Sequence, residues 1–260
     1  MESRINDLKP SVKTVDEELL KNLNTEIKLT SAEWYQKRKE HWEKKDPNVF
    51  NMVGGFEDSN LPDIKCSIEL LSGLIRTNQL NPKRALDCGA GIGRITENIL
   101  AKFFEEIDLL EQNEKFVAYC KEIFKNNKKI RQIYNSSLQE FKFEKKYDLI
   151  WVQWCLENLE DEDLDPFLKK CLNALNENGI VIIKENLFEF PTDIKENIEN
   201  EPLASNKNYL YSDEDFSKQR PDNTYINLFI KNGFKIKLHF LNPNWPSTME
   251  PLCVYVLEKA

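Results

Sequence analysis

The sequence has no window of about 18 uncharged apolar residues, so it contains no candidate for a membrane-spanning helix. Its first 20 residues carry charges of both signs and no apolar core, which argues against a secretory signal or a transit peptide. It also lacks a Cys-x-x-Cys pair, and its six cysteines are scattered through apolar segments. We therefore expect a cytoplasmic or nuclear protein with free thiols, no metal site and no membrane partner.

The sequence also has fewer basic than acidic residues. The 36 Lys and Arg residues are outnumbered by 44 Asp and Glu residues, for a formal net charge of −8. This balance argues against nucleic acid as a partner, because affinity for phosphate backbones comes from clustered basic side chains. A cationic substrate suits the charge better.

From Arg84 onward, short apolar runs alternate with amphipathic helices, which is typical of βαβ units and a parallel sheet. The length of 260 residues favours one α/β domain with an elaboration. The pattern predicts seven strands, the last two as an edge hairpin, over residues 84–87, 107–110, 131–134, 148–152, 180–184, 235–241 and 253–257. It predicts helices over residues 93–103, 114–126 and 161–176. The fold class is therefore a seven-stranded Rossmann-like α/β fold.

The segment 1–80 is predicted to be an N-terminal helical extension and cap, and 81–260 the core. Helical spacing predicts a helix around 15–23, a second from Ser31 and a third over 64–75, with a flexible apolar loop at 52–56. A polar insertion at about 187–211 interrupts the alternation. The last helix is predicted to begin at Ser212, whose hydroxyl suits an N-cap and which precedes three acidic residues.

A glycine-rich turn, A-L-D-C-G-A-G-I-G-R, follows the first predicted strand and opens a helix. Gly89, Gly91 and Gly93 allow the backbone to turn tightly and approach a ligand. Dinucleotide folds use G-x-G-x-x-G, whereas here that last position is Arg94. Glu111 ends the second predicted strand, where a carboxylate can accept both ribose hydroxyls of an adenosyl group. Together they predict an adenosylmethionine site. The plainer alternative is that the glycines only relieve crowding in a strand-to-helix turn and that Glu111 is a solvated strand end.

Three more residues are predicted to contact the adenosyl ligand. Leu138 and Gln139 follow the third strand, where a backbone N–H and an amide can read the adenine edge. Gln153 follows the fourth strand, where an open α/β sheet places its ligand crevice.

The runs Y-D-L-I-W-V-Q-W-C-L-E-N-L and G-I-V-I-I-K-E-N resemble the α-N-terminal protein methyltransferases, which methylate the free N-terminus of proteins beginning X-Pro-Lys or X-Pro-Arg. The similarity covers about residues 34–186, includes W-Y-x-K…H-W and M-V-G-G-F upstream, and resumes over 212–257. It implies S-adenosylmethionine (SAM) as the cofactor, a β-hairpin insertion and protein N-terminal segments as partners. It places cofactor contacts at the positions already named, Gly89, Gly91, Arg94, Glu111, Leu138, Gln139 and Gln153.

The resemblance also implies an acidic and aromatic substrate channel. Its substrate-binding positions here are Trp42, Val53, Trp154 and Ser212. Its catalytic positions are Asp215, as proton acceptor or partner of a cationic third residue, and Asn186 and Asn158, which place the amine. The plainer alternatives are packing for the tryptophans, a strand cap for Asn186 and a helix-dipole role for Asp215.

Three positions depart from the family. Asn158 stands where a histidine is expected, Ser212 where an acidic residue is expected, and Glu250 where a tyrosine is expected. Neither of the two histidines, His41 and His239, falls at the position of the expected histidine. Two other functions therefore stay open: a methyltransferase for a different amine, either a small molecule or other N-termini, and a weakly active SAM-binding partner of a related enzyme.

Overall fold

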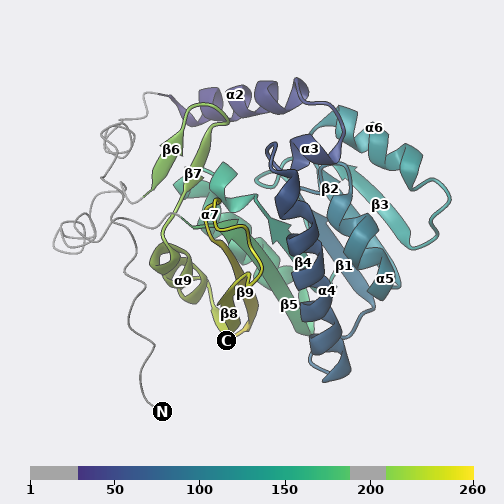
Figure 1. The fold of residues 1–260 in the computed structure, drawn as a ribbon. Coiled ribbons are helices and arrows are strands. Elements are labelled where there is room, and N and C mark those ends of the chain that lie inside the picture. The colour runs from purple at the N-terminus through teal and green to yellow at the C-terminus, as the bar shows by residue number, and fades with distance from the viewer. Residues whose placement is uncertain (1–28, 188–208) are drawn as a thin grey trace, which may run out of the picture.

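The computed structural model describes residues 29–187 and 209–260. A seven-stranded sheet of order β3-β2-β1-β4-β5-β9-β8 forms its centre (Figure 1). The first five strands are parallel, and β9 pairs antiparallel with both β5 and β8. The strands are β1 (Arg84–Cys88), β2 (Glu106–Glu111), β3 (Ile130–Asn135), β4 (Tyr147–Gln153), β5 (Leu175–Asn186), β8 (Phe234–Leu241) and β9 (Leu252–Lys259). All seven predicted strands and the Rossmann-like class are confirmed.

Helices cover both faces of this sheet, so its central strands read as continuous apolar runs. Every residue of β4 is buried. On one face pack α4 (Asn60–Arg76), α5 (Ala101–Phe103) with the π-helical turn Thr96–Leu100 before it, and α6 (Glu114–Ile123). On the other face pack α7 (Asp161–Ala174) and α9 (Asp222–Lys231). Alternate strand residues supply the two apolar cores.

The helix α2 (Ser31–Glu43) begins one residue after its cap. Thr30 accepts the Glu33 N–H while the Glu33 carboxylate accepts the Thr30 N–H at 2.8 Å, a reciprocal capping box. The fully buried Trp34 donates to the Asn158 carbonyl, and Tyr35 donates to Asp163. These contacts hold α2 across the carboxyl ends of the central strands (Figure 1).

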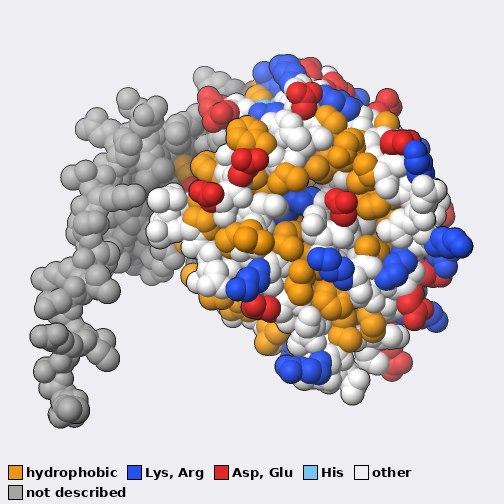
Figure 2. Space-filling model, turned by 45° about the vertical axis from the view of Figure 1, so that its right-hand side comes forward, with side chains coloured by type: hydrophobic (Ala, Val, Ile, Leu, Met, Phe, Trp, Pro, Cys, Tyr) orange, Lys and Arg blue, Asp and Glu red, His pale blue; other side chains and the backbone are white. Residues whose placement is uncertain are grey.

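Of the loop predicted at 52–56, Met52 ends α3 (Val49–Met52), and residues 53–56 form the turn before the short 3-10 helix Glu57–Ser59. The helix predicted around 15–23 and most of the insertion at 187–211 lie outside the described residues. On the face seen in Figure 2, Lys and Arg side chains are interspersed with Asp and Glu, with hydrophobic side chains between them.

The prediction that the last helix begins at Ser212 is wrong. Ser212 ends β6 (Leu210–Ser212), which pairs antiparallel with β7 (Ser217–Gln219), and the helix α9 starts only at Asp222, after Pro221. Ser, Asp and Glu cap helices but also suit tight turns, so the local sequence fits both. Arg38 of α2 favours the hairpin turn over a helix, because its guanidinium binds the turn carbonyls of Asp215 and Phe216 at 2.9 and 2.6 Å.

All six cysteines are buried free thiols, as predicted. Burial raises the pKa of each, so they stay protonated and serve as small packing groups. Within residues 29–187 and 209–260, no helix has both the length and the apolar character that crossing a bilayer requires.

Arg220 offers a test of how β7 is fixed to the core. Its buried guanidinium donates to the carbonyls of Leu156 and Leu159 at 3.0 and 2.9 Å and pairs with Asp161. Arg220→Met leaves these buried acceptors unpaired and should lower the free energy of unfolding by about 3 kcal/mol. Chemical denaturation measures this free energy of unfolding. Arg131→Met, at an exposed ion pair, should change stability by less than about 0.5 kcal/mol, and equal losses in both variants would contradict the assignment.

Candidate active site

A cavity of about 580 Å³ opens at the carboxyl ends of β1, β2, β4 and β5. Its walls also come from α2, the turn after α3, the β6–β7 hairpin and the loop before β9. The structure brings thirteen of the fourteen predicted site residues to this one cavity: Trp42, Val53, Gly89, Gly91, Arg94, Glu111, Leu138, Gln139, Gln153, Trp154, Asn158, Asn186 and Asp215. Ser212 does not line it.

The glycine-rich turn after β1 forms one wall of the cavity. Gly89 and Gly91 have φ angles of +65° and +56°, which side-chain-bearing residues rarely adopt. A Cβ on Gly89 would lie 2.3 Å from Cys155 Sγ, and one on Gly91 would lie 2.7 Å from Met52 Sδ. Gly93 does not line the cavity, since its open side packs against Phe124. Two glycines therefore make a shallow cradle that a ligand can approach, and the third serves packing.

Glu111 holds this turn in place. One carboxylate oxygen accepts the Gly91 N–H at 2.9 Å and the other accepts the Asn113 N–H at 2.7 Å. Burial raises the pKa of Glu111, although the N–H groups of Asn113 and Gly91 act to lower it. Each oxygen retains a free lone pair, so the carboxylate can still accept hydroxyl donors from an adenosyl ribose.

A buried charge cluster that the sequence did not reveal supports both sides of the cavity. Asp63 of α4 accepts from Arg94 at 2.7 Å, from Gln153 at 2.9 Å and from the fully buried Lys184 of β5. Burial alone would raise the pKa of Asp63, but Lys184 and Arg94 hold it below its ordinary value. The guanidinium of Arg94 also lies 5.2 Å from the centre of the Trp154 ring. The sequence could have indicated this cluster through Lys184, a lysine that directly follows the apolar run I-V-I-I.

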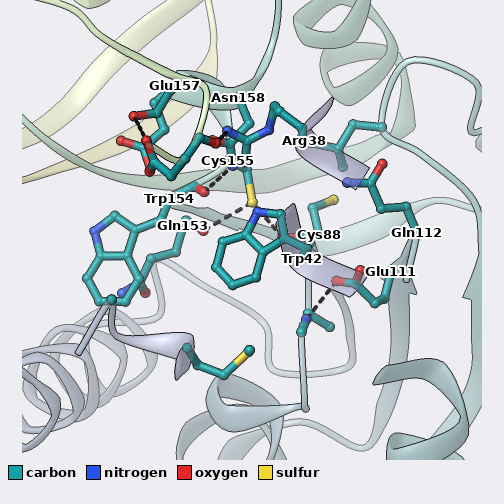
Figure 3. A pocket seen from close by; sticks show the side chains of 18 of the residues that line it. Arg38, Trp42, Cys88, Glu111, Gln112, Gln153, Trp154, Cys155, Glu157 and Asn158 are labelled. Atoms are coloured by element: carbon teal, nitrogen blue, oxygen red, sulfur yellow. Dashed lines mark hydrogen bonds between the residues drawn. The ribbon is translucent and has the colours of Figure 1, made fainter. Parts of the chain in front are cut away.

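Trp154 is the centre of the opposite wall. Its φ is +54°, a strained value for a non-glycine residue. Its indole N–H donates to Asn186 Oδ1 at 2.6 Å, and its carbonyl accepts from Asn158 Nδ2 at 2.8 Å. Asn186 also donates to the Glu250 carbonyl at 3.1 Å. Asn186 thus orients the Trp154 ring, which faces the cavity (Figure 3), and Asn158 holds the Trp154 backbone.

The same end of the cavity is acidic. Asp215 accepts from Ser217 at 2.8 Å, and Glu157 and Glu250 line the cavity near it. Behind them the fully buried Glu185 has its pKa raised to about 7 by burial, against the N–H groups of Leu156 and Cys155. Sequence reasoning missed Glu157, Glu185 and Arg38: Glu157 and Glu185 lie within the two runs that resemble the family, but nothing in those runs shows that these carboxyl groups are buried or face a cavity. This wall can attract and hold a cation.

Asp87, at the glycine turn, yields a pH prediction. Burial raises its pKa from 3.8 to about 6, against the hydrogen bond from Thr96 and the charge of Arg94. Between those values the native protein binds more protons than the unfolded chain, so stability falls as pH rises. Asp87→Asn should remove this dependence, and unfolding free energies from pH 4 to 7 should show wild type losing on the order of 2 kcal/mol relative to the variant. The exposed control Asp58→Asn should follow wild type; parallel curves for Asp87→Asn would refute the assignment.

Comparison with known proteins agrees with this geometry. Residues 30–258 match the family described as AdoMet dependent proline di-methyltransferase. Alpha N-terminal protein methyltransferase 1 of Dictyostelium discoideum is 33% identical over 232 residues, which is 87% of this chain and 80% of that protein. Human N-terminal Xaa-Pro-Lys N-methyltransferase 1 is 36% identical over 171 residues, 64% of this chain and 77% of that protein.

A solved SAM-dependent methyltransferase from Leishmania major superposes with a TM-score of 0.76 at 29% identity, covering 93% of this chain and 90% of that one. The family match spans all but three of the described residues and includes both walls of the cavity. The chain belongs to the AdoMet-dependent proline di-methyltransferase family and is a SAM-dependent methyltransferase.

Proposed function

We propose that this enzyme transfers methyl groups from SAM to the α-amino group of protein N-termini that begin X-Pro-Lys or X-Pro-Arg. The observation that carries the proposal is the division of one cavity into two ends. Glu111 and the glycine turn form one end, and Trp154 with three carboxyl groups forms the other. The relatives named for N-terminal and Xaa-Pro-Lys methylation support the same substrate.

The cofactor end fits SAM by its donors and acceptors. Glu111 can accept the ribose hydroxyls, the cradle at Gly89 and Gly91 admits close approach, and Leu138 and Gln139 line the same end for the adenine. Arg94, held by Asp63, and Gln153 complete the lining toward Trp154. SAM supplies an electrophilic methyl group on a sulfonium. The protein's part is then mainly to position the two reactants and exclude water.

The substrate end fits a cationic N-terminus that contains proline. The Trp154 ring, and Trp42 from α2, offer apolar faces to a proline ring. Asp215 and Glu250 offer acceptors to the α-ammonium or to the lysine or arginine at the third position. As part of this proposal the protein acts in the cytoplasm or nucleus, where buried free thiols are compatible with a reducing environment.

Removing the charge of Glu111 tests the cofactor end. Glu111→Gln should weaken binding of S-adenosylhomocysteine about tenfold, the effect of losing a charge-assisted hydrogen bond. Titration calorimetry on the full chain gives the dissociation constant. Glu114→Gln, an exposed carboxyl three residues later, should bind as wild type. Equal affinity in all three proteins would exclude Glu111 from the cofactor site.

A peptide assay tests the substrate end. Asp215→Asn should lower kcat/KM about tenfold for a Ser-Pro-Lys peptide and less for Ser-Pro-Gln, because only the former has a cationic third residue that Asp215 can bind. Mass spectrometry counts the methyl groups transferred, and Asp213→Asn, exposed in the same turn, is the matched control. Transfer unaffected by Asp215→Asn combined with Asn186→Ala would refute the assigned site. Methylation of small amines alone, or cofactor binding with no turnover, would refute the proposed substrate.

A further inference from the structure

Glu157 is the one carboxyl group at the substrate end with no assigned partner in residues 29–187 and 209–260. It belongs to the 3-10 helix Leu156–Asn158, which follows β4, and its half-buried side chain lines the cavity. Its carboxyl forms no hydrogen bond or ion pair with a described side chain, whereas Asp215 accepts from Ser217 and Glu250 accepts from Gln219. Figure 3 shows Glu157 beside Asn158, across the cavity from Glu111.

The groups around Glu157 favour its protonated form. Glu185 of β5 is fully buried next to the same 3-10 helix, since its Oε1 accepts the N–H groups of Cys155 and Leu156 at 2.9 and 2.8 Å. Its Oε2 has no hydrogen-bond partner in the described part of the chain. Removal from solvent, and then the negative charge of Glu185, raise the pKa of Glu157 well above its ordinary value. The other charged groups that act on Glu157 are Asp215 of the hairpin turn and Glu250 of the loop before β9, which raise its pKa, and Arg38 of α2, which lowers it.

The neighbouring amide groups and the two histidines cannot replace Glu157 as a base. Asn158 and Asn186 are amides without a useful basic nitrogen, and both are bonded to Trp154. His41 and His239 do not line the cavity. A carboxyl group with a raised pKa is matched to an α-amino group, whose reference pKa is about 7.7 to 8, far better than an ordinary carboxylate.

We propose that Glu157 is a catalytic residue that takes the proton from the substrate's α-ammonium group, and that Glu185 is a positioning residue that keeps Glu157 a strong enough base. The role rests on the proposed N-terminal methyltransfer. The proton moves from nitrogen to a Glu157 oxygen and leaves through the open cavity to water. The freed lone pair then forms the N–C bond while the C–S bond breaks and its electron pair stays on sulfur, so the charge is conserved.

The test is the pH profile of methyl transfer by the full chain, from pH 6 to 10, with labelled SAM and a Ser-Pro-Lys peptide. Glu157→Gln should lower kcat about 100-fold at pH 7, with a loss that shrinks toward pH 9.5, where the amine deprotonates without help. Glu185→Gln keeps an acceptor for the two N–H groups but removes the charge. Because Glu157 must be ionised to accept a proton, a lower pKa should move the rising limb of the profile to lower pH.

Glu177→Gln, exposed at the opposite end of β5 from Glu185, is the matched control and should keep the wild-type profile. Binding of S-adenosylhomocysteine should be unchanged in all variants, which shows that they are folded. An active wild type with an unshifted profile in Glu157→Gln overturns the role of Glu157 alone. A uniform loss at every pH overturns it too, since that marks a purely structural effect. A wild type without activity on any X-Pro-Lys peptide overturns the proposed function, and the role of Glu157 with it.

Discussion

The ion cluster around Asp63 is the interaction on which the rest of the active site depends. Three elements remote in sequence meet there, because Arg94 follows the glycine turn, Gln153 ends β4 and Lys184 lies in β5. Buried charges are tolerated only when they are paired, so each partner fixes the others. The Lys184 carbonyl in turn accepts the Trp154 N–H at 2.9 Å. A single buried carboxylate thus ties the cofactor wall to the substrate wall.

The cofactor end and the substrate end of the cavity offer different interactions to their ligands. At the cofactor end, Glu111 pairs with backbone N–H groups, and glycines with positive φ angles bring backbone without side chains to the cavity wall. At the substrate end, aromatic surface is combined with carboxyl groups whose pKa values rise on burial, such as Glu157 and Glu250. A ligand that carries an apolar ring beside a positive charge satisfies both features at once, and a proline-containing N-terminus has this composition.

The substrate end is assembled from two segments that are far apart in the sequence, one before the first strand and one between β5 and β8. Helix α2 and the β6–β7 hairpin reach the cavity together, since Arg38 binds the hairpin turn and the Lys218 ammonium lies 4.9 Å from the centre of the Trp34 ring. Of the three positions at which the resemblance leads one to expect another residue, Asn158 and Glu250 line this end of the cavity. Ser212 lies in a strand away from the cavity, whereas Glu250 adds a carboxyl group to it.

The sequence by itself determined the seven strands, the helices between them, the glycine turn and Glu111. These follow from apolar periodicity and from backbone constraints that act within a few residues. It did not determine where the last helix begins, because S-D-E-D suits a hairpin turn as well as a helix cap and Arg38, far away in sequence, selects the turn. Nor did it reveal Asp63, Lys184 and Glu157, since a buried charge depends on partners from other elements of the fold: Asp63 and Lys184 are separated by 121 positions. Only the tertiary structure brings such groups together, because their interaction energy exists only once the low-dielectric core has closed around them.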